Sequence, residues 1–86
     1  MHIRFTKHSI GKFGILLRHG VAISRKKVIE TVEKVPIVDT VSRYPLVIFQ
    51  GPLDNRHVLR VICKREGNTF VVVTFYPGRK SQYEKK

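Results

Sequence analysis

Apolar residues near the start of the chain recur every three or four positions, which is the spacing of an amphipathic helix. Gly20 then stands where a helix usually ends. The pattern predicts a first helix over residues 7–19, with its apolar positions at Ile10, Phe13, Leu16 and Leu17. Before it, Ile3 and Phe5 alternate with polar neighbours, which fits either a short strand or an apolar lead-in.

A second helical stripe follows after a short connection. Ser24 is a favourable N-cap, and charged residues occupy the positions that face away from the stripe. Pro36 ends the helix because the residue before a proline is restricted to an extended conformation. We therefore predict a second helix over residues 25–34, with its apolar stripe formed by Val28, Ile29 and Val32.

Beyond Pro36 the pattern becomes typical of strands, rich in Val, Ile, Thr, Phe and Tyr. Gly67 and Asn68 suit a two-residue hairpin turn. The expected strands are residues 37–42, 46–50, 57–65 and 69–76. The predicted fold class is α+β, a single domain over residues 1–86 in which two N-terminal helices pack on one face of a four-stranded antiparallel sheet.

The hairpin turn also predicts which residues face each other on the last two strands. The expected pairs are Glu66 with Thr69, Lys64 with Val71, Ile62 with Val73, and Arg60 with Phe75. A slip of one residue would exchange the two faces. In this register one face is almost wholly apolar and suits the helices, whereas the face that carries Arg60 and Lys64 is more open to a ligand.

The net charge of the chain indicates what kind of partner it binds. The 86 residues include 17 Lys and Arg against 6 Asp and Glu, a formal net charge of +11. Such a surface attracts polyanions, and nucleic acid is the commonest of these inside cells. The simpler alternative is that the charge only prevents self-association. Hydrophobic residues make up 42% of the chain, so the charge belongs to a folded surface.

Other classes of protein fit the sequence poorly. The longest uncharged run, residues 44–53, is far shorter than the roughly 20 residues of a membrane span. No apolar stretch near the start has the length of a signal peptide. Cys63 is the only cysteine, so it cannot form an intramolecular disulfide. We expect a cytoplasmic protein that does not contact membranes.

Four segments carry a resemblance to a known family: Phe-Thr-Lys-His at residues 5–8, Arg-His-Gly-Val at 18–21, His-Val-Leu-Arg-Val-Ile at 57–62, and Val-Val-Val-Thr-Phe-Tyr-Pro at 71–77. Together they resemble a family of small uncharacterised prokaryotic domains allied to the RelE and BrnT toxins of type II toxin–antitoxin systems. The resemblance covers nearly the whole chain. It implies a two-helix layer against a curved antiparallel sheet and metal-independent cleavage of messenger RNA, often on the ribosome.

The resemblance also implies partners. A cognate antitoxin protein keeps such a toxin inactive, and RNA is its substrate. Relatives with the same fold act on gyrase instead, so the fold alone does not fix the target. Our leading interpretation is an endoribonuclease of a toxin–antitoxin system. The alternative is a nucleic-acid-binding domain without catalysis, or a toxin that acts on a protein.

Cleavage of RNA without a metal requires phosphate binding and proton transfer at the ribose 2′-OH and the departing 5′ oxygen. Arg60 matches the strand arginine that binds phosphate in RelE-like enzymes, although it would serve equally well as a solvated residue or as a partner of Glu66. Arg79 and Lys80 follow the last strand, where the family places another phosphate-binding arginine. A merely soluble protein also carries such a basic tail.

Tyr83 resembles the C-terminal tyrosine that stacks on a base or exchanges a proton in some RelE-like enzymes, although it also suits packing of the tail on the sheet. His8 is a second candidate for proton transfer, because the unperturbed pKa of histidine, about 6.5, lies near neutral pH. A helix-capping histidine is the simpler interpretation of His8. His57 also suits the task, although its side chain is expected to point away from Arg60.

The sequence therefore yields a defined set of candidate residues. The catalytic candidates are His8, Arg60, Arg79 and Tyr83, and the candidates for nucleic-acid binding are Lys64, Arg79, Lys80, Lys85 and Lys86. No metal or other cofactor is expected. His8 and His19 share a helix face, but about 16 Å separates them, too far to bind one ion. Cys63 is interpreted as a buried apolar residue. A homodimer or a heterocomplex would cover the basic, partly apolar sheet face.

Overall fold

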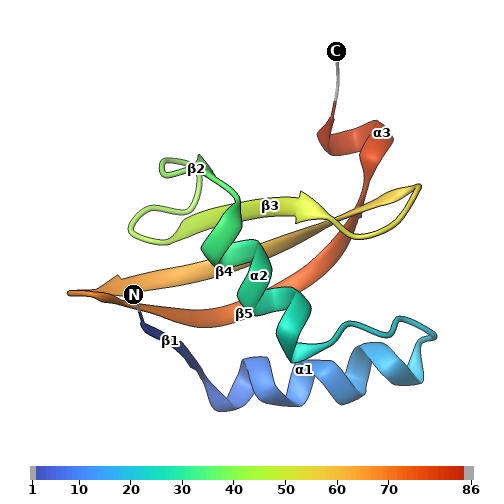
Figure 1. Cartoon of the computed structure of the whole chain (residues 1–86), viewed down its shortest axis with the longest axis horizontal. Helices are drawn as coiled ribbons and strands as arrows, with labels where there is room; N and C mark the ends of the chain where they lie inside the picture. The colour runs from blue at the N-terminus through green and yellow to red at the C-terminus, as the bar shows by residue number, and fades with distance from the viewer. Residues whose placement is uncertain (1, 85–86) are drawn as a thin grey trace.

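The computed structural model describes residues 2–84, which form three helices and five strands in an α+β fold (Figure 1). The elements in chain order are β1 (His2–Phe5), α1 (Lys7–Arg18), α2 (Arg25–Lys34), β2 (Ile37–Asp39), β3 (Val47–Pro52), β4 (His57–Glu66), β5 (Thr69–Arg79) and α3 (Lys80–Tyr83). The predicted α+β class and the two N-terminal helices are confirmed. The sheet has one more strand than expected.

The fifth strand comes from the first residues of the chain. The strand order is β1-β5-β4-β3-β2, and β1 pairs parallel to β5 while the other neighbours are antiparallel. The expectation of four antiparallel strands is therefore wrong: the sheet is mixed. Ile3 pairs with Phe70 and Phe5 with Val72, so the alternation of these two residues belongs to a strand.

The beginning of α1 is fixed to the same strand. Thr6 is the N-cap residue, and its Oγ1 accepts a hydrogen bond from the Ser9 backbone N–H at 3.1 Å. The Thr6 hydroxyl also lies 3.2 Å from the Val72 carbonyl oxygen and 3.3 Å from that of Val73. Ser9 is fully buried, and its hydroxyl donates to the Thr6 carbonyl at 2.9 Å. These bonds hold α1 beside β5 where β1 ends.

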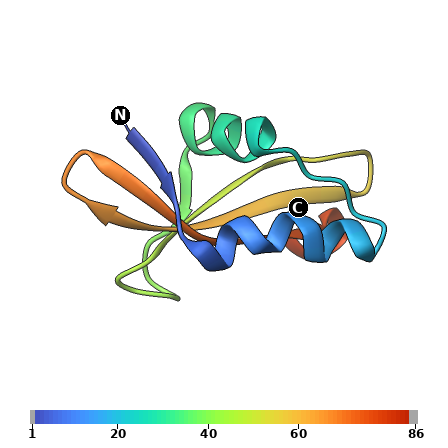
Figure 2. The same cartoon turned by 90° about the horizontal axis from the view of Figure 1, so that it is seen from below.

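The three helices occupy different positions around the sheet. In Figures 1 and 2, α2 lies across β3 and β4, whereas α1 runs beside β5 along the edge that begins with β1. Phe13 from α1 still reaches the apolar core, with its ring centroid 4.6 Å from that of Phe75. The short helix α3 follows β5 directly. Packing of both N-terminal helices on one face is thus correct for α2 and only partly correct for α1.

The hairpin of β4 and β5 contains a β-bulge that the sequence did not reveal. Glu66 pairs with Thr69 and Lys64 with Val71, as predicted. Cys63 then pairs with Val72, but Ile62 pairs with Thr74, so Val73 is an extra residue on β5. Beyond the bulge, the expected pairs of Ile62 with Val73 and of Arg60 with Phe75 are wrong.

The bulge exchanges the side chains that reach each face. Arg60 faces Tyr76, and Phe75 instead points into the core, where it is fully buried. The core under α2 joins ten buried residues: Ile23, Val28, Val32, Phe49, Leu59, Val61, Cys63, Phe70, Val72 and Phe75. Cys63 is buried as predicted, and its burial raises the pKa of the thiol to about 12. Val58 and Ile62, which alternate with these core residues, are also fully buried, so the opposite face is less open than expected.

Candidate functional site

A basic concavity lies where β4 begins and β5 ends. It has a volume of about 490 Å³ and is lined by Arg56, His57, Arg79, Lys80 and Ser81. Strand pairing produces this arrangement, because His57 at the start of β4 is the register partner of Arg79 at the end of β5. The Lys80 backbone N–H donates to the Arg56 carbonyl at 2.9 Å and holds the start of α3 against this strand end. Cationic side chains, a histidine and a hydroxyl thus gather at one hollow.

Asp54 orients the histidine of this concavity. Its Oδ1 accepts hydrogen bonds from the backbone N–H groups of Arg56 and His57, each at 2.8 Å. The His57 Nδ1 lies 2.9 Å from the same oxygen. The hydrogen bond from the Arg56 backbone, followed by the bond to the His57 side chain, holds the pKa of Asp54 below its ordinary value. Both contacts of the His57 ring to Asp54 involve Nδ1, so Nε2 is the ring nitrogen that Asp54 does not bind.

Arg60 lies in a different environment. Gln50, Arg60 and Tyr76 are neighbours across β3, β4 and β5. The Arg60 Nε donates to the Tyr76 hydroxyl at 3.1 Å, and its Nη1 donates to Gln50 Oε1. The guanidinium carbon lies 4.2 Å from the centre of the Tyr83 ring. Arg60 therefore connects two neighbouring strands and α3.

Tyr83 also packs closely on the backbone of β5. Its ring lies so near Gly78 that there is no room for a side chain at that position. Glycine at position 78 is thus what allows α3 to fold back on the strand. The predicted catalytic candidates Arg60 and Tyr83 are in contact, which fits the alternative that the tail packs on the sheet. The alternative interpretation of Arg60 as a partner of Glu66 is not what the structure shows, because Glu66 binds Arg4 and Lys64.

The two predicted phosphate-binding arginines lie on opposite faces of the sheet. Arg79 pairs with His57, so the two side chains share a face. His57 lies three positions before Arg60 on β4, and because side chains alternate between faces along a strand, Arg60 is on the other face. Arg60 is accordingly absent from the side chains that line the basic concavity. The structure brings Arg79 and Lys80 together and does not bring Arg60 to them.

His8 lies far from Arg79. It is exposed on the first turn of α1, two residues after Thr6, whose hydroxyl binds the carbonyl groups of Val72 and Val73. Arg79 lies six positions after Val73 on β5, a separation of about 20 Å at the rise of a strand. His8 therefore does not line the basic concavity that contains Arg79.

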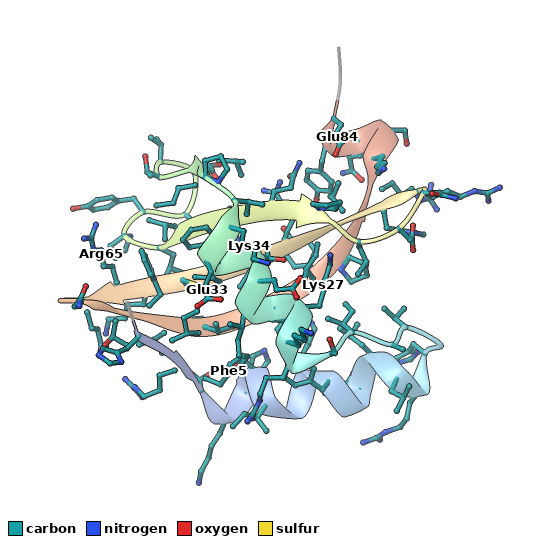
Figure 3. All side chains as sticks on the ribbon, in the orientation of Figure 1. Phe5, Lys27, Glu33, Lys34, Arg65 and Glu84 are labelled. Carbon is teal, nitrogen blue, oxygen red and sulfur yellow. The ribbon has the colours of Figure 1, made fainter. Side chains whose placement is uncertain are left out.

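The other candidates for nucleic-acid binding are scattered. Lys64 is exposed near the end of β4, with its Nζ 3.2 Å from Glu66 Oε2, an exposed ion pair that contributes little to stability. Figure 3 shows Arg65, the next residue, at the opposite end of the sheet from Glu84, which follows α3. Lys85 and Lys86 lie outside the described residues. Among the members of this group that lie within residues 2–84, only Arg79 and Lys80 line the basic concavity.

The sequence interpretation missed Asp54 and Arg56 and gave His57 a minor place. An Asp followed three residues later by a His in a turn is the signal that was available, because an aspartate in such a turn binds the backbone N–H groups that follow it. A turn of this kind brings the histidine ring close to the aspartate carboxylate. The strand partner of His57 was not available, since the predicted last strand ended at residue 76, before Arg79.

Comparison with known proteins adds nothing to this geometry: no protein-family model, curated protein or solved structure matches the chain. None of the helices within residues 2–84 is long and apolar enough to cross a membrane. In the same range, no three His, Cys, Asp or Glu side chains are placed to hold a metal ion together. Function therefore rests on the chemistry of the site itself.

Proposed function

We propose that this protein is a toxin-type endoribonuclease that cleaves messenger RNA without a metal ion and is held inactive by a cognate antitoxin. The observation that supports the activity is the basic concavity in which His57, oriented by Asp54, lies beside Arg79 and Lys80. The toxin–antitoxin setting follows from the family resemblance alone. In this proposal His57 replaces His8 as the group that accepts a proton.

The reaction uses the ribose 2′-OH next to the scissile phosphate. The His57 Nε2 removes the 2′ proton, and the 2′ oxygen attacks the phosphorus. The bond between phosphorus and the 5′ oxygen breaks, and this oxygen takes a proton from the Lys80 ammonium. The products are a 2′,3′-cyclic phosphate and a 5′-hydroxyl end. Arg56 and Arg79 stabilise the negative charge that develops on the phosphate oxygens.

Arg60 and Tyr83 have a supporting role in this scheme. Their contact fixes α3 against β4, and α3 carries Lys80 and Ser81 to the basic concavity. Arg60 uses its Nε and Nη1 for protein acceptors. This distribution makes Arg60 a positioning residue and leaves phosphate binding to the cations that line the hollow.

The test compares two histidine variants of the full chain. End-labelled messenger RNA would be incubated with the protein in EDTA, with and without ribosomes. We expect His57→Gln to lower the cleavage rate by about 10²- to 10⁴-fold, the usual contribution of a positioned acid or base. His8→Gln, a change at an exposed histidine of α1, should leave the rate within about twofold. A DNA strand of the same sequence should stay intact, because it lacks the 2′-OH.

The outcomes separate the proposal from its alternative. Tight binding of RNA that weakens with salt, with no product under any condition, would contradict the enzyme and favour a nucleic-acid-binding domain. Equal cleavage by the unmodified protein and His57→Gln would place the chemistry outside the basic concavity.

A further inference from the structure

An apolar groove lies beside the loop that joins α1 to α2. Its volume is about 600 Å³, within the roughly 300–1,000 Å³ of small-molecule pockets. The apolar side chains along it include Phe13, Leu17, Ile23 and Leu53. Leu17 is 63% exposed, so the groove opens to solvent. Gly14 from α1 also lines it, and beyond the adjoining backbone of the helix and the two neighbouring residues no atom lies within 4 Å of where a Cβ at Gly14 would be.

This apolar groove and the basic concavity are linked by lining residues that each shares with a third hollow. A smaller hollow between them shares Ala22 and Leu53 with the groove and shares His57 with the basic concavity. The Leu53 backbone N–H donates to the His57 carbonyl at 3.1 Å, which fixes the relative position of these two residues. His57 therefore stands between an apolar hollow and a cationic one.

We propose that the apolar groove binds the base of the nucleotide next to the scissile phosphate, an inference that rests on the proposed function. A nucleotide has an anionic phosphate and a flat, largely neutral base, and the two hollows offer one environment for each. The net charge of +11 favours an anionic nucleic-acid strand as the occupant, and the cationic Lys27, labelled on α2 in Figure 3, is among the lining residues of the groove.

The walls predict how the base is recognised. The Ser24 hydroxyl accepts a hydrogen bond from the Lys27 backbone N–H at 3.0 Å, so it serves the cap of α2. The remaining walls are mainly aliphatic and aromatic carbon. Such a surface binds the faces of bases and tolerates any sequence, as stacking surfaces for single-stranded nucleic acids do. We expect the same affinity for purine-rich and pyrimidine-rich strands within about threefold.

Two glycines of the same helix provide a matched test. Gly14 and Gly11 both lie on α1 with open space around an added Cβ, but only Gly14 lines the apolar groove. Gly14→Leu fills the groove, and Gly11→Leu adds the same side chain elsewhere. The probes are a single-stranded 2′-O-methyl RNA, which resists cleavage because its 2′ oxygen is blocked, and inorganic polyphosphate, which has charge and no bases.

We expect Gly14→Leu to weaken binding of the RNA about tenfold, the effect of losing one base contact, and to leave binding of polyphosphate unchanged. Gly11→Leu should change neither. Circular dichroism would check that both variants fold. Leu17→Ser is the second variant, to be used if Gly14→Leu does not fold. It removes an exposed wall of the groove and should weaken RNA binding about threefold.

Two results would overturn the inference while the proposed function stands. Equal RNA binding by Gly14→Leu and Gly11→Leu would leave the groove for an apolar segment of a protein partner. Equal loss of RNA and polyphosphate binding in Gly14→Leu would mean that the change acts on the basic concavity. If the unmodified protein neither binds nor cleaves RNA, the function and the groove assignment fail together.

Discussion

Two arginines near the end of the β4–β5 pair face opposite sides of the sheet and have different surroundings. Arg60 donates hydrogen bonds to Gln50 and Tyr76 and lies under the ring of Tyr83. Arg79, on the other face, lines the basic concavity. A guanidinium bound to protein acceptors holds elements together, whereas one at an open hollow can bind a phosphate. The total charge of a chain does not distinguish these uses, and the neighbours of each cation do.

The largest difference between the two arginines should appear in catalysis. We expect Arg79→Gln to lower the rate of RNA cleavage by about 50-fold. This is less than the 10²- to 10³-fold loss that follows removal of a donor from a water-excluded site, because Arg79 is exposed. The rate would be measured on labelled RNA at low substrate concentration. Arg43→Gln, a change at another exposed arginine, is the control and should have little effect. Equal loss in both variants would mean that net charge alone matters.

For the stability of the fold, we expect Arg60 to matter more than Arg79. Arg60→Met keeps an apolar stem but leaves Gln50 and Tyr76 without their donor. We expect it to lower the free energy of unfolding by about 1.5 kcal/mol. The midpoint of thermal unfolding should fall by roughly 6–12 °C at the size of this domain. Arg79→Met, at an exposed position, should change the free energy of unfolding by less than about 0.5 kcal/mol. Equal unfolding temperatures in the two variants would contradict the structural role of Arg60.

Local patterns in the sequence were sufficient for the helices and for most of the sheet. The stripes of α1 and α2 and the turn at Gly67 depend on neighbours within a few residues, and these elements were predicted within a residue or two. The pairing of β1 with β5 depends on residues 67 positions apart, such as Ile3 and Phe70. No local pattern specifies such a contact, so Ile3 and Phe5 remained ambiguous.

The site was harder to predict because one bulge changes the direction of every side chain beyond it. Residues 71–73 are all valine, so nothing in their identity marks Val73 as the unpaired one. The bulge moves Phe75 into the core and Tyr76 next to Arg60. The grouping of Arg79 with Lys80 followed from their adjacency in sequence. Their proximity to His57 depends on the pairing of Arg79 with His57 at the ends of β5 and β4. The sequence did not predict this pair, because the expected last strand ended at residue 76.

The smallest effect concerns the loop beside Arg60. The Asp39 carboxylate accepts hydrogen bonds from the Ser42 side chain, from the Ser42 backbone N–H at 2.9 Å and from the Val41 N–H at 2.8 Å. These bonds, led by the Ser42 hydroxyl, lower the pKa of Asp39 from 3.8 to about 2, and the charge of Arg60 adds a small part. Because the folded pKa lies below the unfolded one, the carboxylate stabilises the loop above about pH 4, and this contribution is lost as the pH falls towards 2.

An NMR titration of the Asp39 carboxyl carbon would test this directly. In the unmodified protein we expect a midpoint near pH 2, in line with the pKa of about 2. Ser42→Ala should raise the midpoint most, because the hydroxyl bond is the largest cause of the shift, and Arg60→Met should raise it only slightly. A midpoint near the ordinary 3.8 in the unmodified protein would mean that the carboxylate is not held by this loop. A larger rise in Arg60→Met than in Ser42→Ala would mean that the charge of Arg60, although bound to Gln50 and Tyr76, still dominates its surroundings. Arg60 would then remain available to attract an anion, and the contrast with Arg79 would narrow.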